Sequence, residues 1–248
     1  MLTDKQDAFG HEMYDCVTDE KMRNYLIEIV ERDDGYIEAT GGPVRYLYEY
    51  EKWPAYYKKA IRYARGKVLD IGCGAGRHAL YLQEKGLRVI GIDNSHLAIK
   101  VCKQRGLKDA RLISINQINS KLGIFDTILL MGGNFGLFGS FEGARRLLEK
   151  LDKITSSKGR IIADTLDIYK TDNPDHLSYH EFNRKRGRMG GQVRMKVRYK
   201  KYATPWFDYL MVSKKEMESI LGGTDWKVAK YIDSEGPSYI AIIDKKKR

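Results

Sequence analysis

The segment Val68–Arg77, V-L-D-I-G-C-G-A-G-R, limits the possible folds more than any other part of this sequence. A short apolar strand enters a turn that has glycine at three alternate positions, and a helical stretch follows. Glycine tolerates positive φ angles and lets a ligand lie directly against the backbone. The helix after such a turn directs its free N–H groups toward the turn. The segment therefore predicts an α/β fold with a nucleotide-type binding site after a buried strand.

Beyond this turn, short apolar strands alternate with helices. The alternation is typical of a parallel sheet that is covered by helices on both faces. We expect an α/β fold with a doubly wound, mostly parallel sheet and an antiparallel insert after the fifth strand. The expected strands are residues 68–71, 88–93, 110–115, 125–131 and 160–164, and the expected helices are residues 78–85, 97–105 and 141–154.

The two ends of the chain follow other patterns. Residues 27–31 and 36–40 are β-rich and flank an acidic turn with glycine, which predicts a hairpin. Pro54 predicts the first turn of a helix that ends near residue 65. After the fifth strand we expect strands 192–199 and 206–212, a capped helix 213–221, and a terminal strand pair, 226–232 and 239–244.

The glycine spacing indicates the kind of ligand. A dinucleotide site has the pattern G-x-G-x-x-G and holds a pyrophosphate at the helix N-terminus. Here the pattern is G-x-G-x-G, and Asp70 precedes it by two residues. The Asp70 carboxylate would repel a pyrophosphate but could pair with an ammonium group, directly or through water. The expected ligand is a nucleoside that carries an amino acid, and S-adenosylmethionine fits this description.

A second carboxylate agrees with this ligand. Asp93 ends the apolar run V-I-G-I-D, 23 residues after Asp70, where it could accept hydrogen bonds from both ribose hydroxyls. The combined pattern resembles class I S-adenosylmethionine-dependent methyltransferases, firmly over residues 68–164 and by overall layout elsewhere. The resemblance implies a Rossmann-like sheet of seven strands with the last strand reversed.

The resemblance also implies which residues contact the cofactor. After the third strand this family commonly has an acid that receives the adenine amino group, and this sequence has Asn116, whose amide oxygen can accept the same bond. The fourth strand would end under the sulfonium, at Met131 to Asn134. The expected cofactor-binding residues are Asp70, Gly72, Gly74, Gly76, Asp93, Asn94, Asn116, Gln117 and Met131, together with Arg45 and Tyr46 from the N-terminal part.

Residues 1–65 are expected to form a helical and hairpin lid on one compact S-adenosylmethionine-binding domain, residues 66–248. The aromatic run that begins at Tyr46 could pack the lid on the sheet, or its rings could surround the methylsulfonium. Arg45 could bind the methionine carboxylate. His11 and Tyr14 are weak candidates for a proton acceptor, and the sequence identifies no other catalytic residue.

Three cysteines, Cys16, Cys73 and Cys102, form no C-x-x-C pair, which excludes a disulfide scaffold and a cysteine-rich zinc site. His176 and His180 lie four residues apart without a further metal-site signature, so we expect no metal. The polar N-terminus is not a signal peptide, and no stretch reaches the roughly 18 apolar residues of a membrane helix. We expect a soluble, cytoplasmic protein without a membrane partner, and the sequence does not indicate its oligomeric state.

The net charge of +11 is partly concentrated in one segment. Nine Lys or Arg and no Asp or Glu lie between Arg184 and Lys201. The cations at positions 194, 196, 198 and 200 alternate with apolar residues, so a strand would place them on one face. That face is either solvated, or it is a wall that holds a carboxylate, a phosphate or RNA.

The expected function is transfer of a methyl group from S-adenosylmethionine to a small-molecule acceptor by in-line displacement, with S-adenosylhomocysteine as the product. The acceptor would be anionic if the basic face contacts it. Two alternatives stay open, which are an RNA methyltransferase that uses the basic strand at residues 192–201 and a cofactor-binding regulatory protein without turnover. The glycine spacing and Asp70 disfavour a nicotinamide-dependent oxidoreductase.

Overall fold

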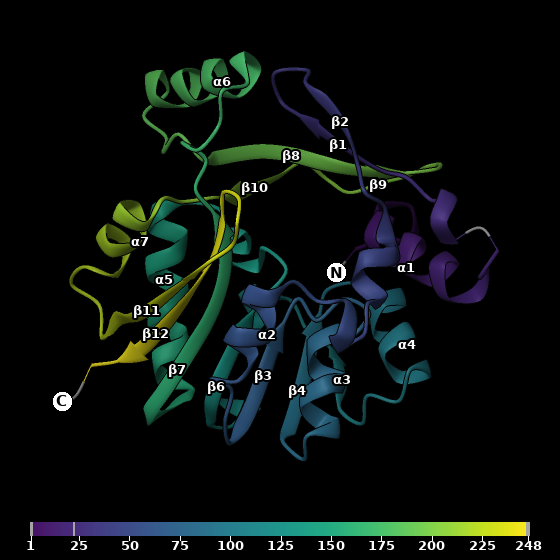
Figure 1. Cartoon of the computed structure of the whole chain (residues 1–248), viewed down its shortest axis with the longest axis vertical. Coiled ribbons are helices and arrows are strands. Elements are labelled where there is room, and N and C mark those ends of the chain that lie inside the picture. The colour runs from purple at the N-terminus through teal and green to yellow at the C-terminus, as the bar shows by residue number, and fades with distance from the viewer. Residues whose placement is uncertain (1, 22, 247–248) are drawn as a thin grey trace. The chain divides into compact units, whose positions relative to one another are not determined.

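The computed structural model describes residues 2–21 and 23–246, and it contains most of the expected elements within a few residues of their predicted bounds (Figure 1). The helices are α1 (Ala8–Thr18), α2 (Ala55–Ile61), α3 (Arg77–Glu84), α4 (His96–Gln104), α5 (Phe141–Lys153), α6 (Pro174–Lys185) and α7 (Lys214–Leu221). The strands are β1 (Glu28–Arg32), β2 (Ile37–Thr40), β3 (Lys67–Ile71), β4 (Arg88–Asp93), β5 (Ala110–Leu112), β6 (Phe125–Leu130), β7 (Thr155–Leu166), β8 (Gln192–Tyr199), β9 (Tyr202–Ala203), β10 (Phe207–Leu210), β11 (Trp226–Asp233) and β12 (Ser238–Lys245). Short 3-10 helices are η1 (Asp4–Gln6), η2 (Arg23–Tyr25), η3 (Pro43–Leu47), η4 (Tyr50–Lys52), η5 (Ile115–Gln117), η6 (Ser120–Leu122) and η7 (Asn134–Phe138).

Seven strands form one sheet, in the order β11-β12-β7-β6-β3-β4-β5. β4 pairs with β5 in parallel, and β6 pairs with β7 in parallel. β12 is antiparallel to both of its neighbours, β7 and β11. The prediction of a mostly parallel sheet of seven strands with a reversed last strand is therefore confirmed. β3 and β4 are neighbours, and Gly72 N, just after β3, donates to the carbonyl of Ile92 near the end of β4, so the turns that follow the two strands lie at one edge of the sheet.

A second sheet contains the N-terminal hairpin. β1 and β2 pair as expected, with Glu28 opposite Thr40 and Glu31 opposite Ile37. β8 is antiparallel to β1, and the full order is β10-β8-β1-β2, with β9 beside β8. The sequence predicts the antiparallel character of this region but not the partnership of β8 with β1, because a pairing between strands so far apart in the chain leaves no local pattern.

Several elements differ from the sequence-based expectation. α2 ends at Ile61 and not near residue 65, and the short strand β9 was not expected. β5 ends at Leu112, because the chain turns there into η5, whose Gln117 side chain accepts a backbone hydrogen bond. β7 begins at Thr155, five residues early, where a polar stretch resembles a loop. The sequence does not predict α6, because its apolar residues do not recur with helical spacing. Its start, with Asn173 as N-cap and Pro174 in the first turn, was the available signal.

The chain forms two compact units that alternate along the sequence. The first unit contains residues 1–53, 70–117 and 194–207, and the second contains residues 54–69, 118–193 and 208–248. The functional division into a lid of residues 1–65 and a binding domain of residues 66–248 stays a prediction. No helix within the described residues combines the length and the apolar character needed to cross a bilayer.

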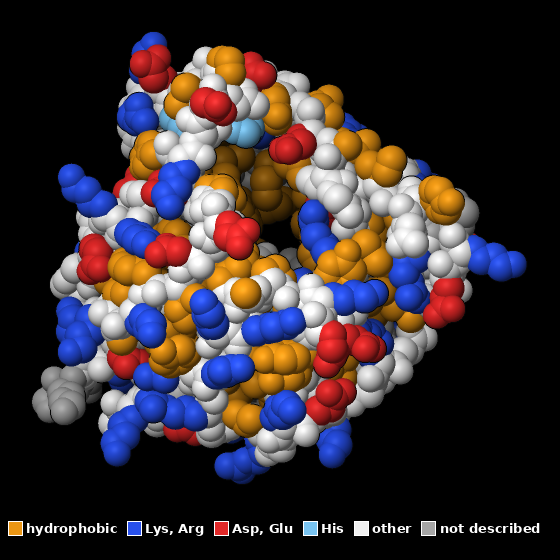
Figure 2. Space-filling view, in the orientation of Figure 1, with side chains coloured by type: hydrophobic (Ala, Val, Ile, Leu, Met, Phe, Trp, Pro, Cys, Tyr) orange, Lys and Arg blue, Asp and Glu red, His pale blue; other side chains and the backbone are white. Residues whose placement is uncertain are grey.

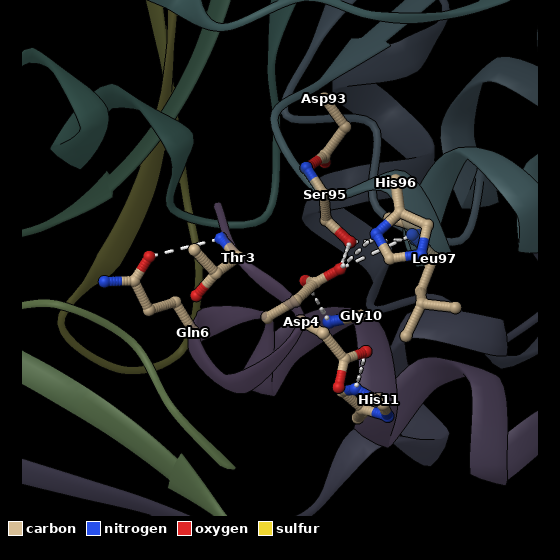
Figure 3. A network of polar contacts seen from close by, with 11 residues as sticks. Thr3, Asp4, Gln6, Gly10, His11, Asp93, Ser95, His96 and Leu97 are labelled. Atoms are coloured by element: carbon tan, nitrogen blue, oxygen red, sulfur yellow. Dashed lines mark hydrogen bonds and ion pairs between the residues drawn. The ribbon is translucent and has the colours of Figure 1, made fainter. Parts of the chain in front are cut away.

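In the first unit, a buried carboxylate fixes α1 to α4. Asp7 is fully buried and accepts hydrogen bonds from Gly10 N (3.0 Å), Ser95 Oγ (2.8 Å) and, at 3.4 Å, Leu97 N (Figure 3). Ser95 is the N-cap of α4, since its Oγ also accepts from Ala98 N at 2.9 Å. One carboxylate thus satisfies donors at the start of both helices, where backbone N–H groups have no partner within the helix.

We expect Asp7→Ala to lower the free energy of unfolding by about 2–3 kcal/mol, because it leaves buried donors unsatisfied. Asp7→Asn keeps one acceptor oxygen and should lose less. Asp4→Ala, which removes a carboxylate whose side chain is 67% exposed, is the matched control and should cost about 0.5 kcal/mol or less. Urea unfolding measures all three values. Equal losses for Asp7→Ala and Asp4→Ala would mean that Asp7 does not fix α1.

Candidate functional site

The glycine turn of the first unit has the conformation that its sequence requires. Gly72, Gly74 and Gly76 have φ angles of 67°, 53° and 81°. Gly76 is the N-cap residue of α3 in the left-handed conformation, and a Cβ there would lie 3.1 Å from Cys102 Sγ. Gly72 N and Cys73 N both donate to the carbonyl of the β4 residue 92, at 2.9 and 3.0 Å. The turn therefore bends over the end of β4, and a side chain at Gly76 would crowd Cys102 and Leu80.

Asp93 connects this turn to the next one. Its Oδ2 accepts from Gly74 N at 3.0 Å, and its Oδ1 accepts from Ser95 N at 2.9 Å. Burial raises the pKa of Asp93, while the two backbone N–H groups oppose that shift. The structure thus brings together two of the predicted cofactor-binding residues, Gly74 and Asp93. A carboxylate has about four acceptor positions, so acceptor capacity remains for a further donor.

Asp70 lies at the end of β3 with only 1% of its surface exposed. Within the described residues its Oδ2 has no hydrogen-bond partner. Burial raises the pKa of the carboxyl to about 7, with a further rise from Asp93 and an opposing effect of Arg77. A buried acceptor without a donor is costly, so this oxygen calls for a water molecule or a cationic ligand group.

Arg45 and Tyr46 belong to a polar cluster around a second buried acid. Glu28, which is 2% exposed, accepts from Arg45 Nη2 (2.7 Å), Tyr46 Oη (2.8 Å) and Thr40 Oγ1 (2.6 Å). Arg77, the first residue of α3, donates to the Arg45 carbonyl at 2.8 Å. The cluster is therefore attached to the glycine turn through Arg77, although one nitrogen of the Arg45 guanidinium is already engaged by Glu28.

Glu12 of α1 is fully buried near this cluster, and neither of its carboxyl oxygens has a hydrogen-bond partner among the described residues. Burial, followed by the charge of Glu28, raises the pKa of Glu12 to about 11. The Glu12 carboxyl is therefore protonated at neutral pH. Next to it, Met13 packs on Ala75 in the glycine turn and on Ala98 and Val101 of α4.

The remaining predicted residues of the first unit lie at or near its surface. His11 stacks on Tyr202, with ring centroids 3.5 Å apart, and its Nε2 is 2.9 Å from Asp4 Oδ1. Tyr14 Oη accepts from Lys100 Nζ at 3.3 Å. Asn94 is exposed after β4, and Asn116 and Gln117 are exposed in η5, which follows β5. The roles of these residues stay predictions.

Met131 belongs to the second unit, where it follows β6 and is buried. Gly133 N, two residues later, donates to Asp164 Oδ2 at 2.8 Å, and Tyr57 Oη donates to the same oxygen. Tyr209 Oη donates to the Gly133 carbonyl. Three side chains of this unit thus fix the turn after β6. No group of three or more His, Cys, Asp or Glu side chains in the described parts of the chain is arranged to hold a metal ion.

Several residues of the first-unit site do not stand out in the sequence. Asp7 precedes α1, and Glu12 and Glu28 are single acids in a helix and a strand, so only tertiary packing shows that the three are buried. Arg105 donates to the Ala75 carbonyl at 2.6 Å, which adds a second attachment of the glycine turn, but an arginine late in a helix resembles a surface residue. The sequence does contain one indication of the role of Asp7. An Asp that precedes a helical stretch can act as its N-cap, and here the Asp7 side chain accepts from Gly10 N.

Glu12→Gln should change the pH dependence of stability. The unfolded chain releases the Glu12 proton above about pH 4.5, while the folded state keeps it to about pH 11, so ionisation increasingly favours unfolding as pH rises between these values. The stability of Glu12→Gln relative to the wild type should therefore rise from pH 5 to pH 9, by at most about 1.4 kcal/mol per pH unit. Glu20→Gln, at an exposed site, should show no trend. Parallel stability curves for wild type and Glu12→Gln would mean that Glu12 is ionised.

This chain is similar to known methyltransferases. A family model described as a methyltransferase domain matches residues 68–159. A crystal structure of an S-adenosylmethionine-dependent methyltransferase from Bacteroides fragilis, in complex with S-adenosyl-L-homocysteine, has a TM-score of 0.83 at 24% identity and covers 99% of this chain and 98% of that chain. A 1,6-didemethyltoxoflavin-N1-methyltransferase from Burkholderia thailandensis has a TM-score of 0.50 at 16% identity and covers 78% of this chain and 79% of that chain.

A putative methyltransferase from Bacillus subtilis (strain 168) is 20% identical over 125 residues, which cover 49% of this chain and 50% of that protein. The chain spans about half the length of the curated relatives it matches. The matched range 68–159 starts in the strand before the glycine turn and includes Asp70, the turn and Asp93. Residues 68–159 are therefore similar to a methyltransferase domain, and the chain has the fold of S-adenosylmethionine-dependent methyltransferases.

Proposed function

We propose that this chain binds S-adenosylmethionine at the glycine turn of its first unit and transfers the methyl group to a small-molecule acceptor. The observation that carries the proposal is Asp70, a buried carboxyl with an unpartnered oxygen at the end of β3. The ammonium group of a methionine moiety would supply both a donor and a compensating charge there. A pyrophosphate would add a charge of the same sign, so Asp70 favours the amino-acid-bearing nucleoside.

Asp93 is suited to hold the ribose. Its carboxylate is fixed by Gly74 N and Ser95 N, and it keeps acceptor positions for the two ribose hydroxyls. Because the same carboxylate orients the glycine turn, its position is set before a ligand arrives. Asn116 is proposed as the acceptor for the adenine amino group, and Arg45 and Tyr46 as contacts of the methionine end.

S-adenosylmethionine, when bound, supplies a methyl group on a sulfonium that is already a strong electrophile. The chain then needs only to hold the acceptor in line and to exclude water, and such positioning can supply about 7–11 kcal/mol of the barrier. We assign exclusion of water to residues 1–65 as a lid. His11 and Tyr14 remain the candidates for accepting a proton from the acceptor, and Met131 is proposed to line the methyl-transfer site.

A small molecule is favoured over RNA as the acceptor by the ion pairs of β8. Lys196 and Arg198 both bind Glu31 of β1, at 2.9 and 2.6 Å, and Lys200 binds Asp15 of α1 at 2.7 Å. The charge of the basic strand is thus largely compensated within the first unit. The structural neighbour from Burkholderia thailandensis, which is named a 1,6-didemethyltoxoflavin-N1-methyltransferase, supports the same choice.

The role of Asp70 predicts a pH-dependent affinity. Below pH 7 the Asp70 carboxyl gains a proton and loses its attraction for an ammonium group, so S-adenosylhomocysteine should bind more weakly at pH 5.5 than at pH 8. The expected change is several-fold and at most about tenfold per pH unit. Asp70→Asn should bind weakly at both pH values. Titration calorimetry measures these affinities, and an Asp70→Asn variant with wild-type affinity and pH dependence would remove Asp70 from the site.

Turnover distinguishes the proposed enzyme from its alternatives. We expect the wild type to convert S-adenosylmethionine to S-adenosylhomocysteine when a small-molecule fraction of a cell extract is added, as measured by mass spectrometry. Asp93→Ala should abolish this conversion, and Asp109→Ala, which removes a carboxylate of the same unit that only pairs with Arg111, should not. Conversion that requires the RNA fraction would favour an RNA methyltransferase. Tight cofactor binding without conversion by any fraction would favour a regulatory protein.

A further inference from the structure

A groove of about 530 Å³ lies in the second unit, between α2 and the edge strand β11. Three of its lining residues are cations, Lys59 and Arg62 at the end of α2 and Lys230 on β11. Lys59 and Arg62 are three residues apart, a spacing that places side chains on the same side of a helix. The volume is within the range of about 300–1,000 Å³ that is usual for small-ligand sites.

A β-bulge brings Lys230 to this groove. Val228 is opposite Ile243 and Lys230 is opposite Ile242, so Ala229 has no partner. Residues that lie opposite each other in paired strands have their side chains on the same face of the sheet. Ile242 and Ile243 are adjacent in β12, so their side chains lie on opposite faces. Lys230 therefore lies on the opposite face from Val228. In a regular strand, Val228 and Lys230 would share one face.

The face that Lys230 reaches is the one that α2 covers. Ile242 is opposite Ile162 of β7, and Asp164, two residues along, has its side chain on the same face. Asp164 accepts a hydrogen bond from Tyr57 of α2, which identifies the face. Lys230 Nζ also lies 5.9 Å from the ring centroid of Tyr63, which lines the groove beside Arg62. The bulge therefore adds a third cation to the two that α2 supplies.

The charged groups around these three cations form ion pairs with other residues. Asp233, the acid that lines the groove, forms an ion pair with Lys214 at 2.6 Å. Arg160, whose guanidinium lies over the Tyr63 ring, is held by Asp244 at 2.8 Å.

Among the described residues, Lys59, Arg62 and Lys230 form no ion pair and no side-chain hydrogen bond. Figure 2 shows Lys and Arg side chains across the face where Figure 1 draws α2 and β11.

We propose that this groove binds a phosphate-bearing ligand with at least two negative charges, such as the diphosphate of a nucleotide. Like charges that face one groove repel one another unless an anion joins them, and arginine with lysine is the usual combination for phosphate. The diphosphate would be held by Arg62 and the two lysines. The site consists of second-unit residues and does not depend on the proposed cofactor site.

Binding of pyrophosphate and of uridine diphosphate to the full chain tests this site. Excess S-adenosylhomocysteine is included, so that neither probe is measured at the glycine turn. We expect binding of both probes at about 50 mM salt and weaker binding at higher salt, because exposed charges are screened. The triple variant Lys59→Gln/Arg62→Gln/Lys230→Gln should weaken binding about tenfold or more, since each lost contact contributes a few-fold.

A matched variant, Lys121→Gln/Lys153→Gln/Lys215→Gln, removes the same charge from exposed sites of the second unit outside the groove. It should retain wild-type affinity, and both variants should keep the melting temperature and the S-adenosylhomocysteine affinity. Equal weakening by both variants, or absence of probe binding to the wild type at millimolar concentration, would overturn the proposal.

Binding of an eight-nucleotide uridine RNA, compared with that of uridine diphosphate, distinguishes a nucleic-acid strand from a free nucleotide as the source of the phosphate. Tighter binding of this RNA than of uridine diphosphate, lost in the groove variant, would support the site with a strand as its ligand. Equal or weaker binding of the RNA would support it with a free nucleotide. If the groove binds no phosphate, the proposal for the cofactor site is not affected, because the test changes no residue of the glycine turn.

Discussion

The first unit depends on the carboxylate of Asp93, because it connects the glycine turn to the start of α4 and, through Ser95, to α1. One oxygen fixes Gly74 in the glycine turn, and the other fixes Ser95 at the start of α4. Ser95 in turn donates to Asp7, which caps α1. The turn, α4 and α1 therefore take their positions from a single side chain at the end of β4. A site fixed in this way loses little conformational entropy when a ligand binds, so binding energy is not spent on ordering the turn.

Two buried acids of the first unit have raised pKa values, but their surroundings differ. Glu12 is enclosed among groups of its own chain, and the nearby charge of Glu28 adds to the effect of burial, so a proton is the cheapest way to neutralise it. Asp70 has a pKa near 7, and Arg77 partly stabilises its charged form. A cation beside Asp70 needs to shift that equilibrium only slightly to keep the carboxylate ionised at neutral pH. Burial alone therefore does not distinguish a structural acid from a ligand-binding one.

The sequence predicts those parts of the fold and site that depend on short segments. The strands before Gly72 and at Asp93 are buried apolar runs, and the glycine turn between strand and helix needs no information from elsewhere. The pairing of β1 with β8 and the burial of Glu12 depend on segments that meet only in the folded chain. An isolated glutamate in a helix has the same local pattern whether its face meets water or another element. The same limit applies to the bulge at Ala229, since no glycine or proline marks it.

The sequence also does not show which charged side chains are paired in the folded chain. Periodicity in the sequence draws attention to β8, where cations alternate with apolar residues, but three of these cations form ion pairs with two acids, Glu31 and Asp15, from segments far away in the chain. The cations of the groove have no periodic pattern, because Lys59 and Arg62 come from a helix and Lys230 reaches them only through a bulge. The sequence gives the number of cations and the strand face on which they lie. Whether an acid pairs with each cation depends on the folded chain. An anion is attracted by net local charge and not by the density of cations. In the groove, the acid Asp233 is paired with Lys214, so Lys59, Arg62 and Lys230 are left to attract an anion.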